Sequence, residues 1–128
     1  MIFSSDIFYL RVFRDKIEVR NVKAGKEELH TVTNNFSNDR MLVADFETFE
    51  SEIRNALKKF QKGRFLTPSM KLIFQPMEEN VSNYSQVEIR SFRDSCEHTG
   101  AKEVFLYFGK DKLTDEKIIN GMNSEFER

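Results

Sequence analysis

Apolar and charged residues alternate along Lys16–Val22. A period of two residues is typical of a strand with one buried face and one solvated face. The preceding segment, Ile7–Phe13, is rich in β-branched and aromatic residues, and Glu27–Thr33 follows a turn at Gly25. The pattern predicts three consecutive strands joined by short turns, which form an antiparallel meander.

The period changes in Phe46–Lys62, where apolar residues recur every three or four positions and form one face of a helix. That face comprises Phe46, Phe49, Ile53, Leu57 and Phe60. Asp45 is placed to cap the first turn, and Gly63 is a suitable residue to end the helix. Before this helix, Met41–Val43 is predicted to be a short strand.

Two later segments, Met70–Gln75 and Val104–Phe108, contain unbroken apolar runs. Such runs suit central strands that are covered on both faces. Between them, a serine and a glutamate three residues apart form a capping-box signature for the helix Ser85–Thr99, which Gly100 ends. Thr114–Met122 is predicted to be a short terminal helix.

The order of elements is therefore β-β-β-α-β-α-β, with a final helix. A three-stranded meander followed by two α-β crossovers is the α/β arrangement of a ribonuclease-H-like or actin-like half-lobe. The length of 128 residues suits a single domain over residues 1–128. A different mixed α/β sandwich stays open as the alternative.

The charge balance and the cysteine content limit which partners and which cellular compartment we expect. Lys and Arg total 20 against 21 for Asp and Glu, so we expect no nucleic-acid partner. Cys96 is the single cysteine, which excludes an intramolecular disulfide. The chain has no apolar stretch of about 20 residues and no secretory signal pattern, so we expect no membrane span and a cytoplasmic location.

Few residues have the chemistry of a metal site. His30, His98 and Cys96 are the only His and Cys side chains, and a structural zinc site needs four ligands. Cys96 shares a helical stripe with Phe92 and is predicted to be a buried core thiol. His98 is expected at the end of its helix, where positive charge is favourable.

Asp6 raises the alternative of nuclease chemistry, which gathers several carboxylates around two metal ions. No acidic residue lies within Met70–Gln75, and Glu78 and Glu79 are expected to form a solvated loop. The sequence therefore predicts no catalytic residue, no metal ligand and no cofactor.

Three segments resemble MreB, the bacterial actin family that organises the walls of rod-shaped cells. Gln86–Leu106 resembles the family pattern Q-V-E-R-R-A-I-R-E-S-A-x-x-A-G-A-R-E-V-F-L. Phe65–Ser69 resembles F-x-R-P-S before a strand, and Phe3–Asp6 resembles F-S-N-D. The resemblance covers Phe3 to Leu106 and implies the first half-lobe of an actin-like fold.

The nucleotide-handling motifs of that family are not matched. The family pattern I-D-L-G-T falls on Tyr9–Phe13, where Leu10 replaces the aspartate that works near the metal. The family's acidic pair after the last strand has no counterpart behind Leu106. Arg11 and Arg14 keep positive charge at the first strand end and are expected to be solvated. We therefore expect no ATP hydrolysis and no enzymatic activity.

The sequence favours a non-catalytic domain that acts through protein–protein contacts, with a second copy of itself or with an MreB-type filament. The alternative is a small enzyme or ligand-binding domain without a recognisable motif. In the family, the helix that matches Ser85–Thr99 lies on the outer surface and takes part in filament pairing. The predicted interface residues on this helix are Ile89, Arg90, Arg93, Asp94 and Glu97. Ile89 is expected on the side away from Phe92 and Cys96, and the mixed charges suit an antiparallel homodimer.

Overall fold

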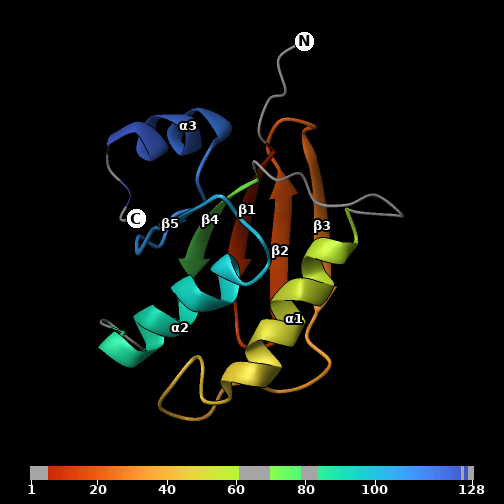
Figure 1. Cartoon of the computed structure of the whole chain (residues 1–128), viewed down its shortest axis with the longest axis vertical. Coiled ribbons are helices and arrows are strands. Elements are labelled where there is room, and N and C mark those ends of the chain that lie inside the picture. The colour runs from red at the N-terminus through yellow and green to blue at the C-terminus, as the bar shows by residue number, and fades with distance from the viewer. Residues whose placement is uncertain (1–5, 61–69, 79–83, 125, 127–128) are drawn as a thin grey trace.

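The computed structural model describes residues 6–60, 70–78, 84–124 and 126. These residues form five strands and three helices (Figure 1). In chain order they are β1 Ile7–Val12, β2 Lys16–Asn21, β3 Lys26–Thr31, α1 Phe46–Lys58, β4 Lys71–Pro76, α2 Gln86–Glu97, β5 Glu103–Leu106 and α3 Asp115–Ser124. The mixed α/β class predicted from the sequence is confirmed.

The five strands form one sheet in the order β3-β2-β1-β4-β5. β1 pairs antiparallel with β2, and β2 pairs antiparallel with β3. β1 pairs parallel with β4, and β4 pairs parallel with β5. The central strand β1 therefore joins an antiparallel half of the sheet to a parallel half.

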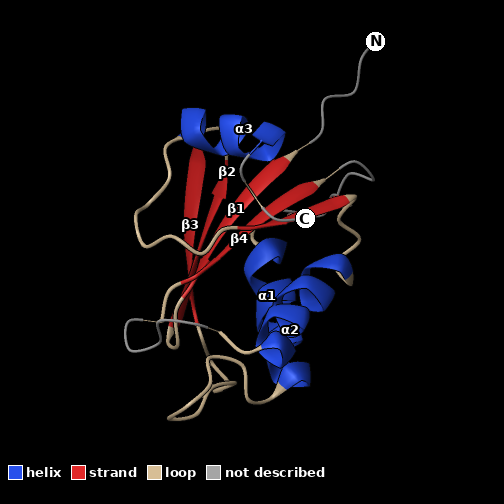
Figure 2. Ribbon diagram, turned by 90° about the vertical axis from the view of Figure 1, so that its left-hand side faces the viewer, coloured by secondary structure: helices blue, strands red, loops and turns tan. Residues whose placement is uncertain are grey.

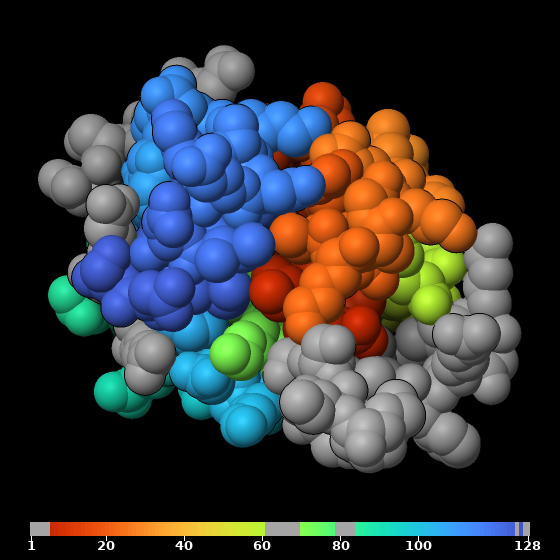
Figure 3. Space-filling view, turned by 90° about the horizontal axis from the view of Figure 1, so that it is seen from above, coloured from red at the N-terminus to blue at the C-terminus, as the bar shows by residue number. Residues whose placement is uncertain are grey.

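Helices lie on both faces of this sheet (Figure 2). The larger core, under α1 and α2, takes the side chains of Phe8, Leu10 and Val12 from β1. The smaller core, under α3, comprises Ile7, Tyr9, Val22, Ile73, Phe105, Leu113 and Ile118. Seen from above, the segment that leads into α3 lies against β2 and β3 (Figure 3). Alternate residues of β1 thus enter different cores, as the period of two in a strand requires.

One predicted element is wrong. Met41–Val43 is not a strand, although Leu42 and Val43 are buried. The backbone N–H of Leu42 donates to Oε2 of Glu88 on α2 at 2.9 Å. A buried N–H needs a partner, and this carboxylate supplies it, so the segment stays a buried loop.

The other predicted boundaries shift by a few residues. α1 ends at Lys58 rather than Lys62, and Phe60 still packs against Phe8 from the following turn, with ring centroids 5.4 Å apart. Gly63, the predicted stop of this helix, lies outside the described residues. None of the helices in the described ranges is both long enough and apolar enough to cross a membrane.

The helix caps follow from the local sequence. Asp45 accepts a hydrogen bond from the backbone N–H of Thr48 at 3.1 Å. At α2, Ser85 Oγ accepts from the N–H of Glu88, and the Glu88 carboxylate accepts from the N–H of Ser85. Gly100 has a φ of 94°, a left-handed conformation that glycine adopts readily at a helix end. The predicted start and stop signals of this helix are confirmed.

A buried carboxylate joins α1 to the end of β3. Glu52 is fully buried, and its Oε1 lies 2.9 Å from Nε2 of His30 and 3.1 Å from the backbone N of Thr33. Its Oε2 accepts from the Thr33 hydroxyl at 3.0 Å. An ionised carboxylate only accepts, so His30 donates through Nε2. Burial raises the pKa of Glu52, but the hydrogen bonds from His30 and Thr33 outweigh it and hold the pKa below its ordinary value.

We predict that Glu52→Gln lowers the free energy of unfolding by about 1–3 kcal/mol, because an amide cannot accept from all of these donors. Glu47→Gln, which removes the same charge from an exposed position in the first turn of α1, should cost less than about 1 kcal/mol. Urea denaturation at neutral pH measures both. Equal losses in the two variants would contradict a specific role for the buried carboxylate.

The same group makes a pH-dependent contribution. Because the folded pKa of Glu52 is lowered, its contribution to stability is present above the ordinary glutamate pKa and is lost as pH falls through the folded pKa. The difference in unfolding free energy between wild type and Glu52→Gln should therefore shrink in acid.

Candidate functional site

The carboxyl ends of β1 and β4 meet at one edge of the sheet, because the two strands are parallel. Open α/β sheets usually bind ligands at such an edge. Here Nη1 of Arg11 lies 2.7 Å from Oε1 of Glu18, and Arg14 is ion-paired with Glu78 and also donates to the carbonyl of Asn38. Both arginines therefore have carboxylate partners. The expectation of a solvated side chain is wrong for Arg11, which is 14% exposed, whereas Arg14 keeps 34% of its side chain exposed.

Glu78 corrects a second expectation. It was predicted in a solvated acidic loop, but it is 5% exposed and pairs with Arg14. Its backbone N–H donates to the hydroxyl of Tyr84 at 3.0 Å, and its carbonyl accepts from Nζ of Lys110 at 3.0 Å. Glu79 lies outside the described residues. The end of β4 is thus tied to three other segments, a feature that no local sequence pattern indicates.

Phe13 fills the turn between β1 and β2. Its ring centroid lies 5.4 Å from Cζ of Arg11 and 4.7 Å from Nζ of Lys16. Each such cation–π contact contributes on the order of 0.5–1 kcal/mol at an exposed site. Phe13 falls on the threonine of the family pattern I-D-L-G-T, and here this turn is occupied by larger side chains that contact one another.

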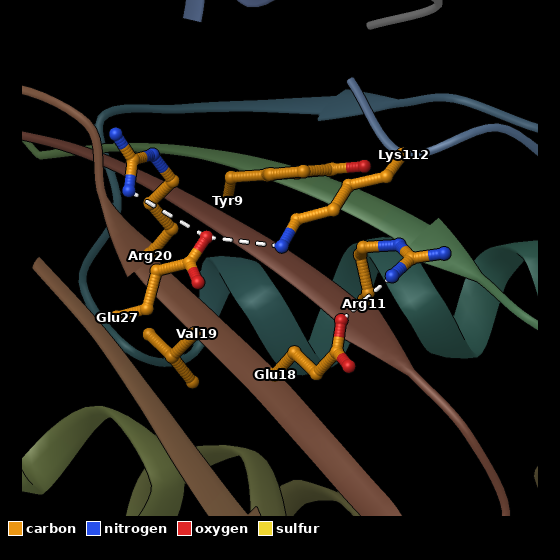
Figure 4. A pocket seen from close by; sticks show the side chains of 7 residues that line it. All are labelled: Tyr9, Arg11, Glu18, Val19, Arg20, Glu27 and Lys112. Atoms are coloured by element: carbon orange, nitrogen blue, oxygen red, sulfur yellow. Dashed lines mark hydrogen bonds and ion pairs between the residues drawn. The ribbon is translucent and has the colours of Figure 1, made fainter. Parts of the chain in front are cut away.

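A small cleft lies on the α3 side of the sheet, between β1, β2, β3 and Lys112 (Figure 4). Lys112 and Arg20 both point toward Glu27, at 3.1 and 3.5 Å, while Arg11 points toward Glu18. The cleft has a volume of about 10 Å³, which is room for roughly one water molecule. It is too small for an organic ligand.

The residues beside this cleft have a structural role. Tyr9 donates its hydroxyl proton to Oε1 of Gln75 and accepts from the backbone N–H of Leu113 at 3.0 Å. Burial raises the pKa of Tyr9. Nε2 of Gln75 donates to the carbonyls of Gly109 and Asp111, at 2.7 and 3.0 Å. This network fastens the segment after β5 to the sheet.

The candidate metal ligands of the sequence do not converge. Within the ranges that the structure describes, no group of three or more His, Cys, Asp and Glu side chains could hold a metal ion. Cys96 is fully buried in the core next to Phe92, as predicted, and burial raises the pKa of its thiol to about 12. His98 stands at the C-cap of α2, also as predicted.

The outer side of α2 carries a shallow depression. It is lined by Gln86, Val87, Ile89, Arg90, Arg93 and Asp94. Four of the five predicted interface residues therefore lie together, and Glu97 is exposed one turn further along. Val87 is the residue that the sequence argument missed: its side chain is 68% exposed. The sequence did contain a signal for an exposed apolar residue here. Val87 is a β-branched residue in the N-terminal turn of the helix, and it lies off the stripe that Phe92 and Cys96 share.

Ile89 does not lie where the sequence argument placed it. It is half-buried and packs against the core that contains Phe92 and Cys96. The reason is helical geometry, since residues three and seven positions apart share a face. Ile89 therefore supports α2 on the sheet, and its partly exposed side is one of the surfaces that line the depression.

The carboxyl end of α2 is tied to α1 through Glu50. Its Oε2 lies 2.9 Å from Nδ1 of His98, and its Oε1 accepts from Nη2 of Arg54 at 2.8 Å. The hydrogen bond and charge of Glu50 raise the pKa of His98 above its ordinary value, with smaller contributions from Asp94 and Glu97. The contact between His98 and Glu50 thus connects the two helices of the outer layer.

No family model matches the chain, and no curated protein sequence matches it. Among solved structures, the chain is similar to the crystal structure of MreB5 of Spiroplasma citri bound to ADP, with a TM-score of 0.53 and 9% sequence identity. The match covers 82% of this chain and 38% of that one. The chain therefore spans less than half the length of that protein, and the likeness shows a distant actin-like fold.

We predict that His98 titrates above the ordinary histidine pKa of about 6.5, and that Glu50→Gln returns it toward that value. The raised pKa means that the pairing with Glu50 stabilises the fold fully below the ordinary pKa and is lost as pH rises through the folded value. The NMR titration of the His98 ring protons measures this shift. Identical titration curves in wild type and Glu50→Gln would contradict the role of Glu50.

Proposed function

We propose that this chain is an actin-like domain that acts through protein–protein contacts and does not hydrolyse nucleotide. The observation that carries the proposal is the outer side of α2, where the exposed Val87 is one of the residues that line the depression. Residues two positions apart on a helix do not share a face, so Val87 and Ile89 lie on opposite flanks of the outer side of α2. Arg90, Arg93 and Asp94 lie between them, and exposed apolar side chains beside arginine and acidic groups suit a protein contact.

The charges along α2 favour a second copy of the chain as the partner. The basic residues Arg90 and Arg93 precede the acidic residues Asp94 and Glu97. In an antiparallel two-fold arrangement, each basic half faces the acidic half of the other helix. An MreB-type filament is the other partner that the actin-like likeness supports.

The absence of nucleotide hydrolysis is inferred from the carboxyl ends of the strands. Leu10, which matches the family's aspartate, is fully buried in the core under α1 and α2. Arg11 and Arg14, the nearest basic groups, already bind Glu18 and Glu78. MreB5 is a protein bound to ADP in its crystal structure, and the arrangement here supports a different use of a similar fold.

The rival function, a small enzyme or ligand-binding domain, needs a cavity that admits a substrate. The cleft around Lys112 holds about one water molecule, and its charged residues are bound to one another. The depression on α2 has a volume of about 680 Å³, but its described lining comes from one helix and contains a single carboxylate and no histidine, cysteine or serine. The geometry of the described residues therefore favours protein contacts.

We predict that Arg90→Glu weakens self-association about ten-fold or more, because it sets acidic residues against Asp94 and Glu97 of the second copy. Exchanging all four charges, with Glu at positions 90 and 93 and Arg at positions 94 and 97, reverses their order along the helix and should restore association. Lys23→Glu, an exposed cation in the turn between β2 and β3, is the matched control.

Sedimentation equilibrium over a range of concentrations measures these association constants. Wild type that stays monomeric, or equal association of wild type, Arg90→Glu and Lys23→Glu, would show that α2 does not mediate a homodimer. Ile89 is not a suitable site for this test, because a charge there would also disturb the core.

We further predict that ATP with magnesium binds with a Kd weaker than about 1 mM, which corresponds to roughly −4 kcal/mol, and is not hydrolysed. Titration calorimetry and phosphate release check this directly. A tighter Kd would contradict the inference from Leu10, Arg11 and Arg14, while leaving the α2 contact to be judged by its own variants.

A further inference from the structure

β3 is an edge strand, and alternate residues turn their backbone groups away from the sheet. The backbone N–H of Val32 donates to the carbonyl of Asp15, so even-numbered residues of this segment face β2. Glu27, Leu29 and Thr31 therefore direct their N–H and C=O groups outward. All three are exposed, and the side chain of Leu29 is 53% exposed. Such an edge is a template for another strand.

One of these outward groups is already occupied. Nζ of Lys59, at the C-cap of α1, donates to the carbonyl of Leu29 at 2.6 Å. α1 lies over the β2–β3 side of the sheet, and its carboxyl end lies beside β3 (Figure 1). Lys59 therefore reaches from the helix layer to the middle of the open edge. Charged lysine side chains at edges are a known means of preventing strand pairing.

The β3 edge is complementary to itself. In a two-fold antiparallel pairing centred on Leu29, the three outward residues would exchange backbone hydrogen bonds with those of a second copy. Leu29 would face Leu29 of the second copy, and Glu27 would face Thr31. On the other face of the sheet Glu28 would be opposite His30, so the register sets no like charges against each other. The second strand that this edge fits best is thus another β3.

We propose that Lys59 guards the β3 edge and prevents a second copy of the chain from adding its own β3 to the sheet. The ammonium group holds the central carbonyl of the edge, and it would have to give up this charge-assisted hydrogen bond before the strands could pair. The surface is separate from α2, so the proposal does not depend on the proposed function.

The test removes the ammonium group and asks whether β3 then pairs. Lys59→Ala should raise the self-association constant about ten-fold or more relative to wild type. The reason is that the charge-assisted hydrogen bond from Lys59 to the carbonyl of Leu29 no longer competes with strand pairing. Lys58→Ala, on the neighbouring and exposed lysine, should leave it unchanged. Lys59→Met keeps most of the apolar stem and should behave as Lys59→Ala does, which covers the case in which alanine destabilises the end of α1.

A second substitution identifies the surface. Thr31→Pro removes an outward N–H and should return the association of Lys59→Met to the wild-type value, whereas Thr31→Val keeps the N–H and should not. Sedimentation equilibrium gives the constants, and circular dichroism shows that each variant is folded. The proposal is overturned if both Lys59 variants associate as Lys58→Ala does, or if Thr31→Pro and Thr31→Val have the same effect.

Discussion

The central strand β1 is almost entirely shielded from solvent. Phe8, Leu10 and Val12 enter the core under α1 and α2, while Ile7 and Tyr9 enter the core under α3. Fully burying one large apolar side chain adds about 1.5–3 kcal/mol to the free energy of unfolding. The strand is therefore stable only if both of its faces are covered. The three helices meet this requirement. The surfaces left for function are the outer sides of these helices and the edge of the sheet at β3.

On the α3 face of the sheet, apolar coverage ends between β1 and the edge strand β3, whereas α1 covers these strands on the other face. On the α3 side, the apolar core gives way to the ion pairs that Arg20 forms with Asp115 and that Lys112 forms with Glu27. The bond between Arg20 and Asp115 is bidentate, with both distances at 2.7 Å. Ion pairs therefore hold Lys112 and Asp115 against β2 and β3, where the apolar core does not extend. The bidentate geometry of the Arg20–Asp115 pair fixes the position of this segment.

The same division underlies the proposal that this chain acts through protein contacts. At the carboxyl ends of β1 and β4, basic, acidic and aromatic side chains pair with one another, and among the described residues the buried Nε of Arg11 is the side-chain atom left without a hydrogen-bond partner. Among the described residues, the outer side of α2 and the edge of β3 are the surfaces on which the proposals rest. The first presents Val87 beside charged residues, and at the second Lys59 binds the carbonyl of Leu29. A domain that associates through one surface benefits from protection of the other, because uncontrolled edge pairing leads to aggregation.

The sequence alone determined features that depend on residues within one or two turns of each other. The caps at Asp45 and Ser85, the left-handed Gly100 and the buried position of Cys96 all follow from local hydrogen bonding and from the helical period. These are short-range effects, and neighbours in the sequence are enough to specify them.

Only the tertiary structure decided which distant groups meet. The bonds of Glu88 to Leu42, Glu52 to His30, Glu78 to Arg14 and Lys59 to Leu29 each join segments more than 20 residues apart or cross from helix to strand. A charged residue has the same sequence signature whether it is solvated or buried with a partner. Its partner is set by the packing of α1 and α2 on the sheet, because burying an unpaired charge is costly and each of these groups therefore bonds to what the fold brings near it.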